Sequence, residues 1–380
     1  MRLLSLSLAV VVAFTVMAAA QDAPQEKPHP VYRLPEGAKF TAHEVRIARP
    51  GDYTQVKVKE DAKQAPEADF EIAGTLNVPT HGKGPFPAVF FISGSGPQDR
   101  HGFGPGTKPG AAGLDQGTWE ILDAMAGAGF AVLRVDDRGT GATPVGPAGI
   151  NPVEVGYQAL VSDARSCVRW LRQRPEVDPK RVFIVGHSEG GITAPLLAGE
   201  ADLGLAGIAC LAGCGRNFYD VIYEQVSEAM KGQSAAMREA NLKVQKELMD
   251  AIKAGREPDF SIVPKALWGR PDVVASRKWM REHFNLDTEA MHKRVTCPVF
   301  VANGERDIQV SAERDARLLA ARLAQGRCKD VTLKLYADLD HLFKACGGRE
   351  SSLKMYEEKR PVDAAFLSDL LAWLKQRLAA

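Results

Sequence analysis

Short apolar runs and amphipathic segments alternate along this chain, with glycine and proline at many of the boundaries. Apolar runs typical of strands occur at 43–48, 70–79, 87–94, 130–137, 181–186, 205–213, 297–304 and 331–338. Helical patterns occur at 118–129, 157–175, 191–199 and 362–378. Because apolar strands alternate with helices, the pattern predicts an α/β fold with a mostly parallel central sheet and helices on both faces.

One segment interrupts this alternation. Residues 216–293 have helical patterns only, and the strands resume after them. We therefore expect a helical cap at 216–293, inserted into a core domain that is formed by 37–215 and 294–380.

The first residues differ from the rest in composition. Residues 1–20, MRLLSLSLAVVVAFTVMAAA, combine one basic residue, an apolar run and three final alanines. This pattern is typical of a cleaved secretory signal peptide, and an uncleaved anchor helix is the alternative. Residues 21–36 are rich in proline and polar residues and are expected to form a flexible leader. The sequence thus predicts an exported protein, periplasmic or secreted, without a stable membrane anchor.

Composition and charge exclude some function classes. The 380 residues are 45% hydrophobic and 25% charged, as in ordinary soluble globular proteins. The formal net charge of +1 becomes 0 once Arg2 is removed with the signal peptide, so nothing in the charge favours nucleic-acid binding. No pattern indicates the oligomeric state.

The chain contains six cysteines, at Cys167, Cys210, Cys214, Cys297, Cys328 and Cys346. An even number permits disulfides in an exported protein, but six in this length is no disulfide scaffold. Cys167 lies on an apolar helix face and Cys297 opens a strand, so we expect buried free thiols at both. No histidines stand at zinc-finger spacing from the cysteines, and we expect neither a metal nor another cofactor.

The stretch RVFIVGHSEGG, Arg181 to Gly191, carries the strongest chemical signal. Ser188 directly follows an apolar strand and precedes a helix, with Gly186 and Gly190 two residues away on each side. A serine hydroxyl becomes a nucleophile when a base removes its proton and nearby donors stabilise the oxyanion. A tight strand-to-helix turn exposes the hydroxyl, and the glycines permit the close approach that such a turn requires.

This G-x-S-x-G turn resembles the nucleophile elbow of the α/β-hydrolase fold family. The resemblance covers nearly the whole chain from about residue 70 and implies the order nucleophile, acid, histidine. GERDIQV puts Asp307 in a G-x-x-D-x-x-V acid loop, and YADLDHLF puts His341 in the terminal histidine loop. The resemblance thus implies a catalytic triad of Ser188, His341 and Asp307, in which Asp307 orients the imidazole.

Other acidic residues and histidines are candidates for the same roles. Glu305 is the main rival for the acid, and Asp338 and Asp340 lie too close to the histidine in sequence to support it easily. His187 is expected to point away from the serine hydroxyl. The sequence assigns no role to His101. The remaining histidines lie in the leader, near early turns or in the inserted segment: His29, His43, His81, His283 and His292.

The resemblance also implies an oxyanion hole of two backbone N–H groups, those of Ser95 and Glu189. The loop FFISGSGPQDRHG is similar to a bacterial esterase subgroup with G-S-G-P-x-D-R-D-G, and His101 stands where the second Asp is usual. Asp99 and Arg100 are expected to form an ion pair that braces this loop. In VDDRGTGAT, Asp137 and Arg138 are expected to fix loops beneath the site.

The function implied is an exported serine hydrolase that cleaves small carboxylic esters through an acyl-enzyme. Phe218, Tyr219, Tyr223 and Trp268 could line its substrate pocket or form the core of the cap. The alternatives are a serine peptidase of the prolyl-oligopeptidase type, an acyl thioesterase, and a non-catalytic binding protein.

Overall fold

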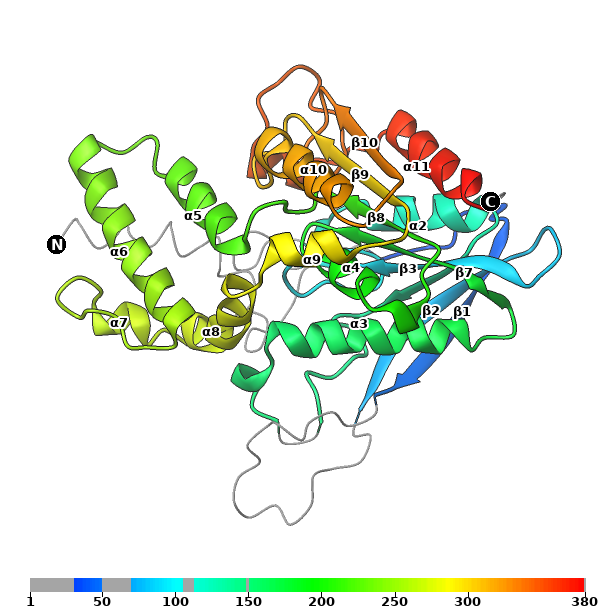
Figure 1. Ribbon diagram of the computed structural model, residues 1–380, viewed down its shortest axis with the longest axis horizontal. Helices are drawn as coiled ribbons and strands as arrows, with labels where there is room; N and C mark the ends of the chain where they lie inside the picture. The colour runs from blue at the N-terminus through cyan, green and yellow to red at the C-terminus, as the bar shows by residue number, and fades with distance from the viewer. Residues whose placement is uncertain (1–30, 50–69, 105–112, 148–149, 379–380) are drawn as a thin grey trace, which may run out of the picture.

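An eight-stranded sheet forms the centre of the protein (Figure 1). The computed structural model describes residues 31–49, 70–104, 113–147 and 150–378, so the predicted signal peptide and most of the leader lie outside the described residues. In spatial order the strands are β1 (Phe40–Ala48), β2 (Glu71–Pro79), β6 (Ala131–Val135), β3 (Phe86–Ile92), β7 (Val177–His187), β8 (Gly207–Leu211), β9 (Val299–Gly304) and β10 (Val331–Tyr336).

The sheet is mostly parallel. β1 pairs with β2 and β2 with β6 in antiparallel fashion, whereas every neighbouring pair from β6 to β10 is parallel. The carboxyl ends of these parallel strands therefore lie along one edge, and the loops that follow them come together there. This confirms the predicted α/β-hydrolase fold.

Helices cover both faces of the sheet because successive strand residues point to opposite sides. Val182 and Ile184 of β7 belong to a buried cluster with α3 (Tyr157–Arg172), α4 (Gly190–Ala198) and α10 (Arg317–Gln325). Phe183 and Val185 of the same strand belong to a second cluster with the helices of the opposite face, α2 (Thr118–Gly127) and α11 (Ala364–Gln376). The core thus consists of two apolar layers separated by the sheet.

The segment between β8 and β9 is helical, as its sequence predicts. It contains α5 (Phe218–Ala229), α6 (Ala235–Ala254), α7 (Lys265–Trp268), α8 (Pro271–Phe284) and α9 (Thr288–Arg294). Helices α5 to α8 extend to one side of the sheet, whereas α9 lies beside α4 and α10 (Figure 1). The exact division into core and cap stays a prediction.

Some elements were absent from the sequence prediction. Helix α10 was missed because it carries two buried leucines, Leu319 and Leu323, within an arginine-rich segment. The short strands β4 (Phe103–Gly104) and β5 (Leu114–Asp115) pair only with each other. All six cysteines are free; Cys167 is buried as expected, but Cys297 is partly exposed.

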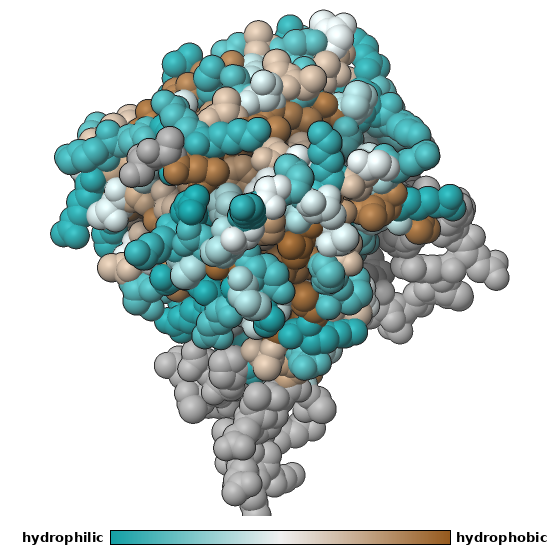
Figure 2. Space-filling view, turned by 90° about the vertical axis from the view of Figure 1, so that its right-hand side faces the viewer, coloured by the Kyte–Doolittle hydropathy of each residue, from teal (hydrophilic) through white to brown (hydrophobic). Residues whose placement is uncertain are grey.

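The surface carries few large exposed apolar side chains. Figure 2 shows one face of the molecule, which is mainly hydrophilic with small groups of hydrophobic residues. Among the described residues the exposed large hydrophobic side chains are Val31, Leu34, Phe260, Ile308 and Leu353. Within the described ranges, every helix is too short or too polar to cross a membrane.

Candidate active site

Ser188 occupies a strained turn directly after β7. Its φ of 53° lies in the left-handed region, which residues with a Cβ rarely adopt. The Ser188 N–H donates to the Leu211 carbonyl (2.8 Å), and the Gly191 N–H donates to the Ser188 carbonyl (2.9 Å). Ser188 is partly exposed, whereas its neighbours His187 and Glu189 are buried. The turn therefore exposes the serine and encloses the side chains on either side of it.

Close packing explains the glycines around this serine. A Cβ on Gly186 would lie 2.1 Å from the carbonyl oxygen of Gly190, and a Cβ on Gly190 would lie 2.2 Å from that of Ile92. A Cβ on Gly191 would lie 2.7 Å from the Cα of Gly213. Side chains at these positions would push α4 away from the ends of three neighbouring strands, so glycine is required at each.

Asp307 and His341 form a buried pair after β9 and β10. His341 Nδ1 lies 2.7 Å from Asp307 Oδ2, and the two side chains are 4% and 0% exposed. The other carboxylate oxygen accepts hydrogen bonds from the backbone N–H groups of Gln309 (2.7 Å) and Val310 (2.9 Å). Because a carboxylate only accepts, Nδ1 carries the proton and Nε2 remains as the basic nitrogen.

The other acidic candidates have different surroundings. Glu305 is exposed. The Asp338 carboxylate accepts hydrogen bonds from two backbone N–H groups of the loop that follows it. Asp340 forms an ion pair with Arg360 at 2.6 Å. Of the four acidic residues considered, Asp307 alone makes an ion pair or hydrogen bond with the histidine ring.

His187 links the elbow to the loop of His341. Its Nε2 lies 2.8 Å from the backbone carbonyl oxygen of His341, and the two rings are 4.8 Å apart between centroids. Burial lowers the pKa of His187 to about 3, and the proximity of His341 contributes to this shift. The ring is therefore neutral near pH 7, with its single N–H on Nε2, and it donates this hydrogen to the loop.

The hydroxyl of Ser188 and Nε2 of His341 make no hydrogen bond with each other, although both residues are among those described. The two residues follow parallel strands of the same sheet and are connected through the hydrogen bond of His187. In unliganded hydrolases this contact is often long and tightens when substrate binds.

Asp137 holds the loop after β3 against the elbow. Its carboxylate accepts hydrogen bonds from Ser93 Oγ (2.7 Å) and the Gln98 N–H (3.0 Å), and its own N–H donates to the Gln98 carbonyl (3.0 Å). A Cβ on Gly94 would lie 3.1 Å from the Cβ of Ser188. Asp137 thus fixes both ends of a loop that touches the serine, as the sequence predicts.

Two backbone donors beside the serine have no acceptor. The N–H groups of Ser95 and Glu189 make no hydrogen bond within the described part of the chain. Ser95 is exposed and follows Gly94, and Glu189 is the N-cap of α4. Free N–H groups at a helix N-terminus and in a tight loop can stabilise an anionic oxygen.

The expected ion pair between Asp99 and Arg100 is wrong. The buried Arg100 pairs with Asp136 (2.7 Å) and Glu44 (2.5 Å). Asp99 accepts a hydrogen bond from the backbone N–H of His101 (2.8 Å). The guanidinium turns inward because the buried Asp136 carboxylate requires a positive partner there.

His101 packs in a structural position. Its ring stacks on Tyr32, with centroids 4.3 Å apart and an interplanar angle of 13°. Burial, together with the positive charges of Arg134 and Arg100, lowers the pKa of His101 to about 3. His101 is therefore neutral near pH 7 and contributes to the packing around Tyr32.

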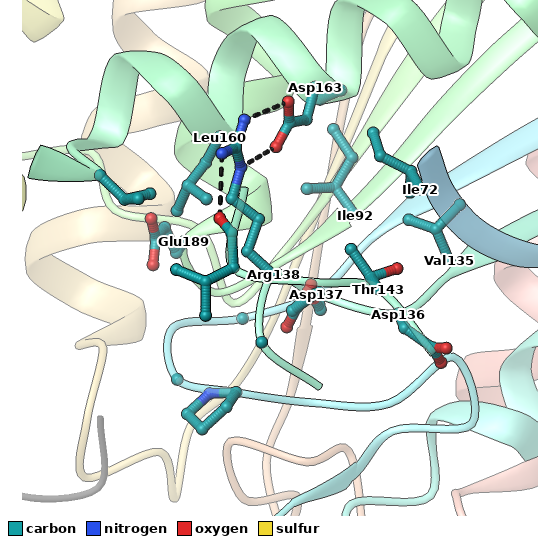
Figure 3. A pocket seen from close by; sticks show the side chains of 18 of the residues that line it. Ile72, Ile92, Val135, Asp136, Asp137, Arg138, Thr143, Leu160, Asp163 and Glu189 are labelled. Carbon is teal, nitrogen blue, oxygen red and sulfur yellow. Dashed lines mark hydrogen bonds and ion pairs between the residues drawn. The ribbon is translucent and has the colours of Figure 1, made fainter. Parts of the chain in front are cut away.

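A cavity of about 500 Å³ lies beside the elbow (Figure 3). Its walls include apolar side chains from β3, the end of β6, α3 and α8, among them Ile92, Val135, Leu160, Ala275 and Trp279. Its volume lies within the usual range for small-molecule pockets.

The cavity is adjacent to the serine without including it. Gly94 and Glu189 line the cavity, whereas Ser188 and His341 do not. The Arg138 guanidinium, which also lines the cavity, is held by Asp163 of α3, so the loop after β6 is fixed there (Figure 3).

None of the four predicted pocket residues, Phe218, Tyr219, Tyr223 and Trp268, lines this cavity. Phe218 packs against Trp279, with ring centroids 5.4 Å apart. Tyr219 donates a hydrogen bond within the inserted helices, and an arginine covers the Trp268 ring. Trp279 was not predicted as a pocket residue, because the pattern of an amphipathic helix does not show which distant residue an aromatic side chain contacts.

No group of three or more His, Cys, Asp or Glu side chains in the described ranges could hold a metal ion.

Asp137 makes the stability depend on pH. Burial raises the pKa of Asp137 to about 8, and the nearby charges of Glu189 and Asp136 add to the increase. The folded protein keeps this proton up to about pH 8, whereas the unfolded chain releases it near pH 4. The free energy of unfolding should therefore decrease as pH rises between these values, and Asp137→Asn should remove part of that decrease.

Urea denaturation of both proteins at pH 5, 6, 7 and 8 measures this effect. Asp202→Asn is the control, because the exposed Asp202 is ionised in both states over this range. Equal pH dependence in wild type and Asp137→Asn would contradict the prediction.

Comparison with known proteins agrees with the fold. The family model described as serine aminopeptidase, S33, matches residues 116–344, more than half of the chain. Esterase EstD of Thermotoga maritima is 27% identical over 305 residues, which cover 80% of this chain. The match spans 65% of EstD, so this chain covers slightly less than two thirds of that relative.

Solved structures share the architecture at low sequence identity. An esterase of Pyrococcus furiosus, Pf2001, has a TM-score of 0.54 and 15% identity, with 94% of this chain and 99% of that chain covered. A hypothetical protein of Pseudomonas aeruginosa has a TM-score of 0.54 and 14% identity, with 93% and 100% covered. These structures show the fold alone. Together with the family match, they lead to one conclusion: the chain belongs to the serine aminopeptidase S33 family of α/β-hydrolases.

Proposed function

We propose that this protein is an exported serine hydrolase that cleaves small carboxylic esters through an acyl-enzyme intermediate. The observation that carries the proposal is the buried pair of Asp307 and His341 beside a serine at φ 53°. Strained backbone conformations of this kind cluster at functional sites. A buried histidine–carboxylate pair is the arrangement that activates a serine hydroxyl in serine hydrolases.

In this mechanism His341 Nε2 removes the proton from Ser188 as the hydroxyl attacks the ester carbonyl. Asp307 holds the imidazole through Nδ1 and stabilises its positive charge. The same Nε2 then protonates the departing alcohol, and water releases the acyl group by the reverse proton transfers. The unbonded N–H groups of Ser95 and Glu189 stabilise the oxyanion, each contributing about 3 kcal/mol.

Small esters are supported as substrates by two observations. The cavity beside the elbow has the size of a small-molecule site and mainly apolar walls. Two proteins similar to this chain, from Thermotoga maritima and Pyrococcus furiosus, are named esterases.

Aminopeptidase activity is the second candidate, because the family description is serine aminopeptidase. The triad chemistry is common to both reactions, so only the substrate distinguishes them. Thioester hydrolysis uses the same residues.

The triad can be tested with a fluorophosphonate probe. Ser188→Ala should abolish labelling, and His341→Ala should lower kcat by several orders of magnitude, because the hydroxyl then lacks its base. Asp307→Asn should lower kcat about 10⁴-fold by favouring the wrong imidazole tautomer. Labelling rates and p-nitrophenyl acetate hydrolysis measure these changes.

The rival acid provides a matched control for this test. Glu305→Gln should retain kcat within about twofold, since exposed carboxylates far from the reacting atoms contribute little. Persistent labelling of Ser188→Ala, or equal losses in Glu305→Gln and Asp307→Asn, would refute the assignment.

A substrate panel separates the candidate activities. Purified protein should hydrolyse p-nitrophenyl esters of short acids at least 100-fold faster, in kcat/KM, than aminoacyl p-nitroanilides, a difference of about 2.7 kcal/mol. Acyl thioesters in the same panel test the thioesterase alternative. Faster cleavage of the anilides would favour the aminopeptidase instead.

Export is proposed from residues 1–20, which lie outside the described residues. Their apolar run and terminal alanines are typical of a cleaved signal peptide. Protein recovered from the periplasm or the medium should begin at Gln21 by N-terminal sequencing. Full-length chain recovered only from the cytoplasm would contradict export.

A further inference from the structure

The side chain of Glu189 connects the nucleophile elbow to the inserted helices. Glu189 directly follows Ser188, and its side chain is only 7% exposed. One carboxylate oxygen, Oε1, accepts hydrogen bonds from Trp279 Nε1 (3.0 Å) and His283 Nε2 (3.0 Å). A buried carboxylate is costly unless donors satisfy it, and here both donors come from helix α8.

The two donors form a rigid unit. Trp279 and His283 are four residues apart on α8 and therefore lie on one helix face. The fully buried His283 ring lies between Tyr157 of α3 and Phe218 of α5, with centroid distances of 3.7 Å and 4.7 Å. His283 Nδ1 has no hydrogen-bond partner among the described residues, and Nε2 carries the hydrogen that the Glu189 carboxylate accepts.

The position of α8 sets the width of the cavity beside the serine. Pro271, Ala275 and Trp279 of α8 line that cavity, and Glu189 belongs to the same wall (Figure 3). Leu160 of α3 also lines it, so a change in the distance between α8 and the core changes the space available.

The cavity favours an uncharged occupant. Three arginines line it, and each lies near a carboxylate. Arg138 pairs with Asp163 and Arg100 with Asp136, whereas Arg134 lies 3.6 Å from Asp123. Glu189 presents its carboxylate to the same space, so an anionic group would be repelled there.

We propose that Glu189 is a positioning residue, which holds α8 against the elbow through Trp279 and thereby limits the length of the uncharged acyl chain that the cavity accepts. This inference rests on the proposed ester hydrolysis. The hydrogen bonds of Glu189 tie the wall of the specificity pocket to the residue that follows the nucleophile.

Acyl-chain preference tests the inference in Trp279→Phe, Glu189→Ala and the double variant. Trp279→Phe keeps a smaller aromatic ring and removes the N–H, so the ratio of kcat/KM for p-nitrophenyl octanoate over butyrate should rise at least fivefold, mainly through a lower KM for the octanoate. Glu189→Ala should change the ratio in the same direction. The double variant should differ from Glu189→Ala by less than twofold, because Glu189→Ala already removes the hydrogen bond that Trp279→Phe removes.

Trp373→Phe is the matched control. Trp373 lies on α11, on the other face of the sheet, and its indole N–H has no partner among the described residues. Its removal should leave the preference unchanged. If Glu189→Ala does not fold, as judged by Tm, the comparison of the two Trp→Phe variants remains decisive.

An unchanged acyl preference in Trp279→Phe, an equal change in Trp373→Phe, or additive effects in the double variant would overturn the inference. Fluorophosphonate labelling of Ser188 should persist in Trp279→Phe. Absence of labelling in the wild-type protein would instead overturn the proposed function, so the two failures are distinguishable.

Discussion

The structure depends on the close approach of α4 to the carboxyl ends of the central strands. With a Cβ at Gly186 or Gly190, backbone atoms would come within about 2 Å of a side chain, which no packing tolerates. The chain reverses there in a single turn, and Ser188 absorbs the strain at φ 53°. The same approach brings the loop after β3 against the serine, so one packing constraint assembles the proposed nucleophile and its proposed oxyanion donors.

The strain at Ser188 must be offset by its surroundings, and both neighbouring side chains contribute. His187 donates to the carbonyl of His341, and Glu189 accepts from Trp279. These two hydrogen bonds connect the elbow to different segments: the first to the loop of His341 and the second to the inserted helices. A left-handed φ costs of order 1–3 kcal/mol and persists only where surrounding contacts fix it. The elbow is therefore the point at which core, base and cavity wall are connected.

The sequence predicted what depends on local pattern. The apolar strands, the glycines at 186 and 190, and the loops of Asp307 and His341 have fixed spacings, and the structure brings the last two together at 2.7 Å. Ion-pair partners were harder to predict, because Arg100 pairs with Glu44 and Asp136, which are distant from it in sequence and approach it only in the folded chain.

The residues of the cavity wall could not be predicted from local sequence pattern either, because they are distant from one another along the chain. Glu189 and Trp279 are separated by 90 positions along the chain, and their contact arises only when α8 packs on the elbow. Trp268 was a candidate pocket residue in the sequence, but in the structure it packs within the inserted helices and does not line the cavity. Helical periodicity reveals which face is buried, but it does not reveal which element buries it.

This division has a physical consequence for how the site can vary. The strand register fixes the edge of the sheet where Ser188, Asp307 and His341 lie, and that register rests on the buried layers of both faces. Helix α8 belongs to an insertion between β8 and β9, so its length and side chains can change without altering that register. What α8 must keep is its contact with the elbow, since a wall that is free to move would no longer define a pocket. The proposed chemistry and the proposed specificity thus belong to different parts of the chain, and Glu189 contacts both parts.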